Sequence, residues 1–352
     1  MLLDQDDFPL HQTALPLAHV MNGHPNAYDR FWFNGYNEES FFAVALGLYP
    51  NRGVIDAAFS VLRDGTQRSV FCGGRLEGRP TAVGPITIEI IEPMRRNRVV
   101  VNAPDHGIRA DLEFLRRTAP VEEPRQSMHD GERIFMDVTR ATQMGTWRGW
   151  IETPEGRLEI EDFMGTKDRS WGVRPIGEPL PGAPSNRAPQ LCFNWAQVNF
   201  ADGALHYMSF DDPRGQPLIR SAHQVPLDGL GDGQHLEGSI VIEPLTATRR
   251  AASATLSIGG QSTLLTPLYT FYMRGAGYSH PQFAHGRWHG DAFVDSELLA
   301  VASLDALEYS NIHVQQVVRA TQGDRVGLGV LETLIIGPYA PMGLSSLLDG
   351  AA

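Results

Sequence analysis

Cysteine is scarce in this chain of 352 residues, and no long apolar run is present. Cys72 and Cys192 lie far apart in strand-like segments, and no Cys-x-x-Cys pair or zinc-ligand spacing occurs. This pattern disfavours zinc fingers and predicts two buried thiols in a reducing compartment. The longest apolar runs, such as 41–48, are much shorter than the roughly 20 residues of a membrane-spanning helix. The first residues have neither the basic nor the apolar region of a secretory signal, so we expect a cytoplasmic protein without stable membrane insertion.

Positive charge is also scarce, because 29 Lys and Arg residues face 41 Asp and Glu residues and leave a net charge of −12. Binding to nucleic acid requires a basic surface that neutralises phosphates, so we expect no nucleic-acid partner. Walker loops, a Gly-x-Gly-x-x-Gly segment after a strand and a Gly-x-Ser-x-Gly elbow are all missing. Nucleotide cofactors and serine-hydrolase chemistry are therefore disfavoured, and we expect no cofactor.

Alternation of apolar and polar residues is the dominant pattern in what remains. It is clear in 86–90, 108–114 and 312–318, and it is typical of strands with one face on a core. Short turn sequences separate the strand-like runs, at Arg63-Asp64-Gly65, Pro154-Glu155-Gly156, Ala201-Asp202-Gly203 and Gln322-Gly323-Asp324. These turns predict hairpins. The sequence therefore predicts an all-β, antiparallel protein.

A linker composition marks the middle of the chain. Residues 175–189 contain five prolines and two glycines, which is typical of a connection between folded units. We expect two β-barrel units, at 1–180 and 190–352, each large enough to close on itself.

The segment Asp168-Arg-Ser-Trp-Gly-Val-Arg174 resembles the lipocalin-like family that includes AttH proteins and carotenoid 1,2-hydratases. Two further similarities are Leu48-Tyr-Pro-Asn51 and His285-Gly-Arg-Trp-His-Gly290, which leads into Phe293-Val-Asp-Ser-Glu297. The resemblance implies two lipocalin-like (calycin-like) barrels in tandem and an apolar ligand in a barrel. Carotenoid members add water across an isoprenoid double bond without a redox cofactor, and related proteins catalyse cyclisations. Arg169 and Ser170 replace the His or Asn of many relatives, which weakens a direct transfer of hydratase activity.

Asp168 is the candidate acid. Hydration of an alkene needs a proton delivered to carbon, and a carboxyl group can deliver it only if burial raises its pKa. Arg169 and Arg174 would favour the ionised form instead. On a strand, Asp168 shares a face with Ser170 and not with Arg169. The alternative is an Asp168–Arg174 pair that pins a loop at the end of the barrel.

Trp171 and Arg174 also admit two interpretations. They are candidates for substrate binding, because an indole face stabilises a developing cation by roughly 0.5–2 kcal/mol. Alternatively, they plug the closed end of the barrel.

The densest histidine cluster is His280, His285 and His289. Nearby proline and glycine residues argue against a helix, and on a strand Arg287 would lie between two of these histidines, so we expect no metal site. His285 is the candidate proton-handling residue, and Glu297 is a candidate second carboxylate. The alternatives are ordinary hydrogen-bonded histidines and a solvated glutamate.

Aromatic residues at alternating positions add substrate-binding candidates, although packing is the default for each of them. They are Trp195, Tyr207, Tyr272 and Trp288. We therefore expect a cofactor-independent hydratase, dehydratase or proton-shift isomerase that acts on an isoprenoid- or steroid-like hydrophobic molecule. Asp168 would be its acid, and His285 or Glu297 its base. The alternatives are a carrier of hydrophobic ligands and an interaction scaffold with filled barrels. A homodimer is left open.

Overall fold

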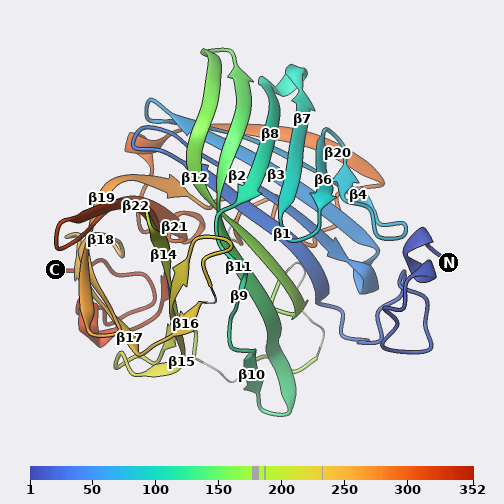
Figure 1. Ribbon diagram of the computed structural model, residues 1–352. Helices are drawn as coiled ribbons and strands as arrows, with labels where there is room; N and C mark the ends of the chain where they lie inside the picture. Colours follow the sequence, from blue (N-terminus) through green and yellow to red (C-terminus); the bar gives the residue numbers. More distant parts are fainter. Residues whose placement is uncertain (177–181, 186–187, 232, 279) are drawn as a thin grey trace.

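The computed structural model describes residues 1–176, 182–185, 188–231, 233–278 and 280–352 and consists of two curled antiparallel sheets (Figure 1). Among these residues the first sheet has 13 strands, in the order β20-β4-β3-β2-β1-β12-β11-β8-β7-β6-β5, with β9 and β10 also paired to β11. The second has nine, in the order β16-β15-β14-β13-β22-β21-β19-β18-β17. The predicted all-β fold of two lipocalin-like units in tandem is confirmed, with each sheet curled as a half-barrel.

The strands of the first sheet are β1 Ala27–Tyr36, β2 Phe41–Tyr49, β3 Val54–Arg63, β4 Thr66–Arg75, β5 Ala82–Val83, β6 Ile86–Glu92, β7 Arg96–Ala103, β8 Ile108–Arg116, β9 Val121–Glu122, β10 Gln126–Asp130, β11 Arg133–Thr153, β12 Gly156–Val173 and β20 Ala292–Ala300. Those of the second are β13 Leu191–Phe200, β14 Gly203–Asp211, β15 Pro217–Pro226, β16 Gln234–His235, β17 Gly238–Pro244, β18 Ala251–Ile258, β19 Gln261–Tyr272, β21 Val314–Gln322 and β22 Arg325–Ile336. Short 3-10 turns are η1 Asp4–Asp7, η2 Pro50–Arg52, η3 Pro104–His106, η4 Val301–Ser303, η5 Tyr309–Asn311 and η6 Ala340–Met342.

All four predicted hairpin turns are confirmed. They join β3 to β4, β11 to β12, β13 to β14 and β21 to β22. In the first of them Asp64 and Gly65 have φ values of 49° and 72°. Positive φ at both central residues matches the twist of the paired strands, which explains the Asp-Gly sequence at this turn.

Side chains of the first sheet are packed on both faces along its central strands. In β1, Phe31 and Phe33 point into the curl of the sheet, where they join one apolar cluster. Tyr28, Trp32 and Tyr36 alternate with them and join a second cluster, to which Phe193 and many other residues of the second sheet also belong. A third cluster fills the curl of the second sheet. The two sheets thus pack against each other through the outer face of the first.

A row of glycines crosses three neighbouring strands on the face that points into the first curl. Gly35 of β1 pairs with Gly165 of β12, which pairs with Gly145 of β11. A Cβ atom on Gly165 would lie 2.3 Å from Nε1 of Trp147. The missing side chains let the buried Trp147 ring lie directly on the strands, where its indole N–H donates to the carbonyl of Asn34 at 2.7 Å.

The C-terminal half of the chain contributes one strand to the first sheet. β20 comes from the C-terminal half but pairs with β4 at the edge of the first sheet. The division into units 1–180 and 190–352 stays a prediction about folding. Within the predicted linker at 175–189, residues 177–181 and 186–187 lie outside the described residues.

The sequence pattern placed His280, His285 and His289 on a strand. In the structure, the segment that carries them is a loop that leads into β20. Its residues pack against β3 and β4 through side chains and not through a ladder of backbone hydrogen bonds. Phe283, for example, stacks on Phe71 with ring centroids 4.7 Å apart. The glycines and the proline of this segment, which argued against a helix, also argue against a regular strand.

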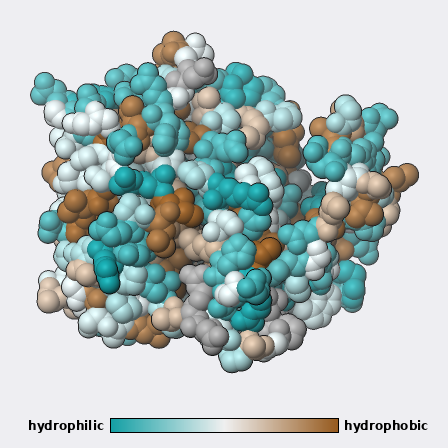
Figure 2. Space-filling model, turned by 90° about the horizontal axis from the view of Figure 1, so that it is seen from below, coloured by the Kyte–Doolittle hydropathy of each residue, from teal (hydrophilic) through white to brown (hydrophobic). Residues whose placement is uncertain are grey.

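Both cysteines are buried, as predicted, and burial raises the pKa of each thiol to about 12. None of the helices in the described part of the chain has the length and apolarity to cross a membrane. The face seen from below carries hydrophobic residues in several separate groups among hydrophilic ones (Figure 2).

The glycine row provides a test of the packing in the first sheet. We expect Gly165→Ala to lower the free energy of unfolding by on the order of 1–3 kcal/mol, because the new methyl group displaces Trp147. Urea unfolding followed by tryptophan fluorescence measures this change. Gly23→Ala is the matched control, since nothing lies within 4 Å of its added Cβ. Equal stability of the two variants would contradict this account of the packing.

Candidate active site

The main cavity lies between the two sheets and not inside either curl, where the family resemblance had led us to expect a ligand. Its volume is about 530 Å³, within the range of about 300–1,000 Å³ that is usual for small-molecule sites. β1, β11 and β12 of the first sheet line one side, and β13, β14 and β22 of the second line the other. Its apolar lining residues include Trp32, Phe135, Met136, Ile176, Leu191, Phe193, Trp195, Phe210, Met273, Leu334 and Ile336.

Asp168 lines this cavity. It pairs with Trp32 of β1 and Thr142 of β11 in the strand register, so its side chain points to the outer face of the sheet. Its Oδ2 atom lies 3.5 Å from Nε of Arg140, while its buried Oδ1 atom has no hydrogen-bond partner. Burial raises the pKa of Asp168, although the charge of Arg140 opposes this. The carboxyl group thus faces the cavity, and its ion-pair partner is Arg140 rather than Arg174.

Arg140 lies between two buried carboxylates, those of Asp168 and Glu123. Its Nη1 atom is 3.5 Å from Oε2 of Glu123. Burial alone would lower the pKa of Arg140, but the two carboxylates outweigh burial and raise it. Glu123 also accepts hydrogen bonds from Trp195 Nε1 at 3.0 Å and from the Thr142 hydroxyl at 2.9 Å. This cluster keeps Arg140 charged at the wall of the cavity.

Glu332 supplies a carboxylate from the second sheet. Its Oε1 atom lies 2.9 Å from Nε2 of His313, and its Oε2 atom accepts a hydrogen bond from Gln315 at 2.5 Å. Burial raises the pKa of Glu332, but the contacts with His313 and Gln315 outweigh burial and lower it. The cavity therefore has two carboxyl groups whose surroundings shift their pKa values in opposite directions.

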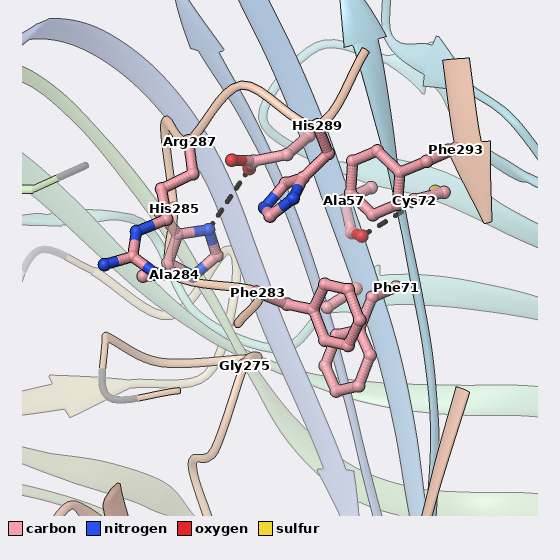
Figure 3. Close-up of a pocket in the computed structure, with 12 residues that line it drawn as sticks. Ala57, Phe71, Cys72, Gly275, Phe283, Ala284, His285, Arg287, His289 and Phe293 are labelled. Carbon is pink, nitrogen blue, oxygen red and sulfur yellow. Dashed lines mark hydrogen bonds and ion pairs between the residues drawn. The ribbon is translucent and has the colours of Figure 1, made fainter. Parts of the chain in front are cut away.

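His285 lies behind the cavity wall, between the side chains of Asp56 and Arg30. Its Nδ1 atom is 3.1 Å from Oδ1 of Asp56, as the dashed line in Figure 3 marks, and its Nε2 atom is 2.9 Å from Nη2 of Arg30. Burial, with the charge of Arg30, lowers the pKa of His285. A neutral ring that donates from Nδ1 to Asp56 offers its only lone pair to Arg30. His285 therefore contacts Arg30 at the cavity wall and has no free lone pair for a substrate, so its role as the base stays a prediction that this geometry does not favour.

Of the other predicted site residues, the structure brings Arg174 and Trp195 to the same cavity as Asp168. Glu297 lies elsewhere, on β20, where its Oε2 atom accepts a hydrogen bond from Arg274 at 2.9 Å, and its role as a base stays a prediction. Trp171 and Trp288 are 44% and 45% exposed. Tyr207 borders a separate cavity of about 240 Å³ on the second sheet, and Tyr272 is buried beside Arg250. These four are not lining residues of the main cavity.

Sequence reasoning missed Glu123, Arg140, His313 and Glu332. Glu332 had a readable signal, because it is the one charged residue in the apolar run 329–336. Arg140 had none, since the polar run 137–143 looks like a solvated strand.

In the part of the chain that the structure describes, no group of three or more His, Cys, Asp and Glu side chains could hold a metal ion. Chemistry without a cofactor stays a prediction.

His206 of β14 makes the stability of this region depend on pH. Burial, together with the charges of His223 and Arg140, lowers its pKa well below the usual value. The unfolded chain therefore binds a proton below about pH 6.5 that the folded chain excludes, and stability falls as pH decreases. We expect His206→Gln to reduce this loss between about pH 7 and about pH 5 by up to about 2 kcal/mol.

Urea unfolding at the two pH values measures the effect. His19 is exposed, so His19→Gln should keep the wild-type pH dependence. A His206→Gln variant with that same dependence would show that His206 is not the source.

Comparison with known proteins supports the fold. Residues 2–345 match a family described as "Family of unknown function (DUF8625)". Kievitone hydratase from Nectria haematococca is similar in structure, with a TM-score of 0.51 and 16% identity over 92% of this chain and 94% of that chain. CghA with Sch210972 has a TM-score of 0.49 and 13% identity over 95% of this chain and 97% of that chain. The search of curated proteins returned no match.

Proposed function

We propose that this chain, which belongs to the family of unknown function DUF8625, is an enzyme that performs acid–base chemistry on a hydrophobic small molecule without a cofactor. The observation that carries the proposal is Asp168, a buried carboxyl group with a raised pKa and a free oxygen atom in a largely apolar cavity. Perturbed carboxyl groups in such cavities are characteristic of catalytic sites. The fold shared with a solved hydratase agrees with an enzyme of this kind.

Asp168 acts as the general acid. A protonated Asp168 transfers its proton to one carbon of a substrate double bond, and the adjacent carbon becomes cationic. Faces of Trp32, Phe193 and Trp195 border the cavity and stabilise such a cation. Attack by water, with loss of a proton, completes a hydration. Loss of a proton from a neighbouring carbon gives an isomer instead.

Glu332 takes the role of base that the sequence assigned to His285 or Glu297. It stays ionised because His313 and Gln315 donate to it, whereas Asp168 favours its protonated form. Two carboxyl groups with opposite pKa shifts are the usual arrangement of an acid and a base in one site. An isoprenoid- or steroid-like substrate is consistent with the size and apolar lining of the cavity.

The test uses small molecules extracted from the purified protein and incubated with fresh enzyme. We expect Asp168→Asn to reduce turnover by about 10²–10⁴-fold, as loss of a general acid does, and wild-type activity to fall as pH rises through the raised pKa of Asp168. Mass spectrometry distinguishes a hydration, which adds one water, from an isomerisation or a carrier. Asp162→Asn, an exposed change on the same strand, is the control. Full activity of a folded Asp168→Asn variant would refute the assignment.

A carrier of hydrophobic ligands is the second candidate, because the same cavity would serve it without an acid. It would return every ligand unchanged. The scaffold alternative requires filled interiors, and the cavity between the sheets argues against it.

A further inference from the structure

Three guanidinium groups reach the main cavity, and two of them have partners in the chain. Arg140 lies between Asp168 and Glu123. Arg30 donates to the carbonyl of Ala276 at 2.5 Å and to His285. The third, Arg174, is buried, and its Nε and Nη2 atoms have no hydrogen-bond partner among the residues that the structure describes.

Two aromatic faces lie beside the guanidinium group of Arg174. Its guanidinium carbon lies 4.7 Å from the ring centre of Tyr28 and 5.1 Å from that of Tyr278. Such contacts offset a small part of the cost of removing a charge from water. Buried guanidinium groups are normally paired and hydrogen-bonded, so the two free donors of Arg174 are suited to an anion.

The two free atoms define the shape of that anion. Nε and Nη2 lie on the same side of a guanidinium group, and together they donate to the two oxygens of one carboxylate. The chain uses this arrangement elsewhere: Arg98 holds Asp111 through Nε at 2.8 Å and Nη2 at 2.7 Å. Arg125 holds Asp137 in the same way, at 2.6 and 2.7 Å.

We propose that Arg174 is the binding site for a carboxylate group, so that the cavity takes an apolar carboxylic acid. The carboxylate accepts hydrogen bonds from Nε and Nη2 of Arg174, and the apolar body lies along Phe193 and Leu334 toward Asp168. Trp32 lines the same cavity with an unpartnered indole N–H, which is available to a further oxygen of the ligand. Calling this ligand the substrate rests on the proposed function, whereas its binding does not.

Binding of matched probes tests the proposal. Decanoate and 1-decanol have the same chain length and differ in their head group. Each displaces the neutral dye N-phenyl-1-naphthylamine from the full-length protein, and dye fluorescence gives its affinity. We expect the wild-type protein to bind decanoate at least about tenfold more tightly than 1-decanol, because a bidentate charged pair exceeds a neutral hydrogen bond.

Variants at Arg174 locate the effect. Arg174→Met should abolish the preference for decanoate while leaving the affinity for 1-decanol within about twofold of the wild-type value. Arg174→Lys should keep only part of the preference for decanoate, because lysine cannot donate two parallel hydrogen bonds to one carboxylate. Arg157→Met, an exposed change on β12, is the control. Equal wild-type affinities for the two probes, or an unchanged preference in Arg174→Met, would overturn the proposal.

The outcomes separate this proposal from the proposed function. Equal binding of acid and alcohol overturns the carboxylate site and leaves an apolar substrate in place. Failure of the dye and both probes to bind overturns the use of the cavity altogether. A decanoate preference that persists in an inactive Asp168→Asn variant supports the carboxylate site by itself. If Arg174→Met does not fold, the wild-type pair and Arg174→Lys still decide the matter.

Discussion

The central strands of the first sheet are buried on both faces, and the rest of the structure depends on this constraint. Alternate side chains of β1 enter two different apolar clusters, one inside the curl and one against the second sheet. Close packing inside the curl requires the row of Gly35, Gly165 and Gly145 beneath Trp147. Because that face is filled, the space for a ligand arises on the other face, where two twisted sheets meet without complementary shapes.

The same alternation decides which polar groups reach the cavity. Asp168 and Arg140 occupy positions on the outer face of β12 and β11, where the second sheet buries Arg140 and leaves the Asp168 side chain 15% exposed. A buried charge must find a partner or shift its pKa. Arg140 finds two carboxylates and stays charged, whereas Asp168 shares its partner with Glu123 and has a raised pKa. Burial is therefore the main cause of the raised pKa of Asp168, and the charge of Glu123, which shares Arg140, adds to it.

Local patterns were sufficient to predict the hairpin turns and many of the strands, because each depends on neighbours within a few residues, but they left open whether Asp168 faces a cavity. The pairing of His285 with Asp56 and Arg30 joins segments more than 200 residues apart in sequence, and no local pattern encodes it. The segment 280–291 was considered as a strand because its proline and glycine residues argue against a helix, but it is a loop that side-chain packing holds in place. Glu332 could have been found from its apolar surroundings, whereas Arg140 could not, since burial of a polar strand is decided by the opposite sheet.

The charged groups of the cavity are less completely paired than the two-bond ion pairs of Arg98 and Arg125. Arg98 and Arg125 each bind a carboxylate through two hydrogen bonds near the surface. Solvent screens the charges of these pairs. In the cavity, one oxygen of Asp168 and two donors of Arg174 have no hydrogen-bond partner in the described part of the chain. These groups do not satisfy each other, because the closest cation to Asp168 is Arg140. A protein that gained only stability from these residues would have paired them, so their separation is best explained by a ligand that spans the distance from Arg174 to Asp168.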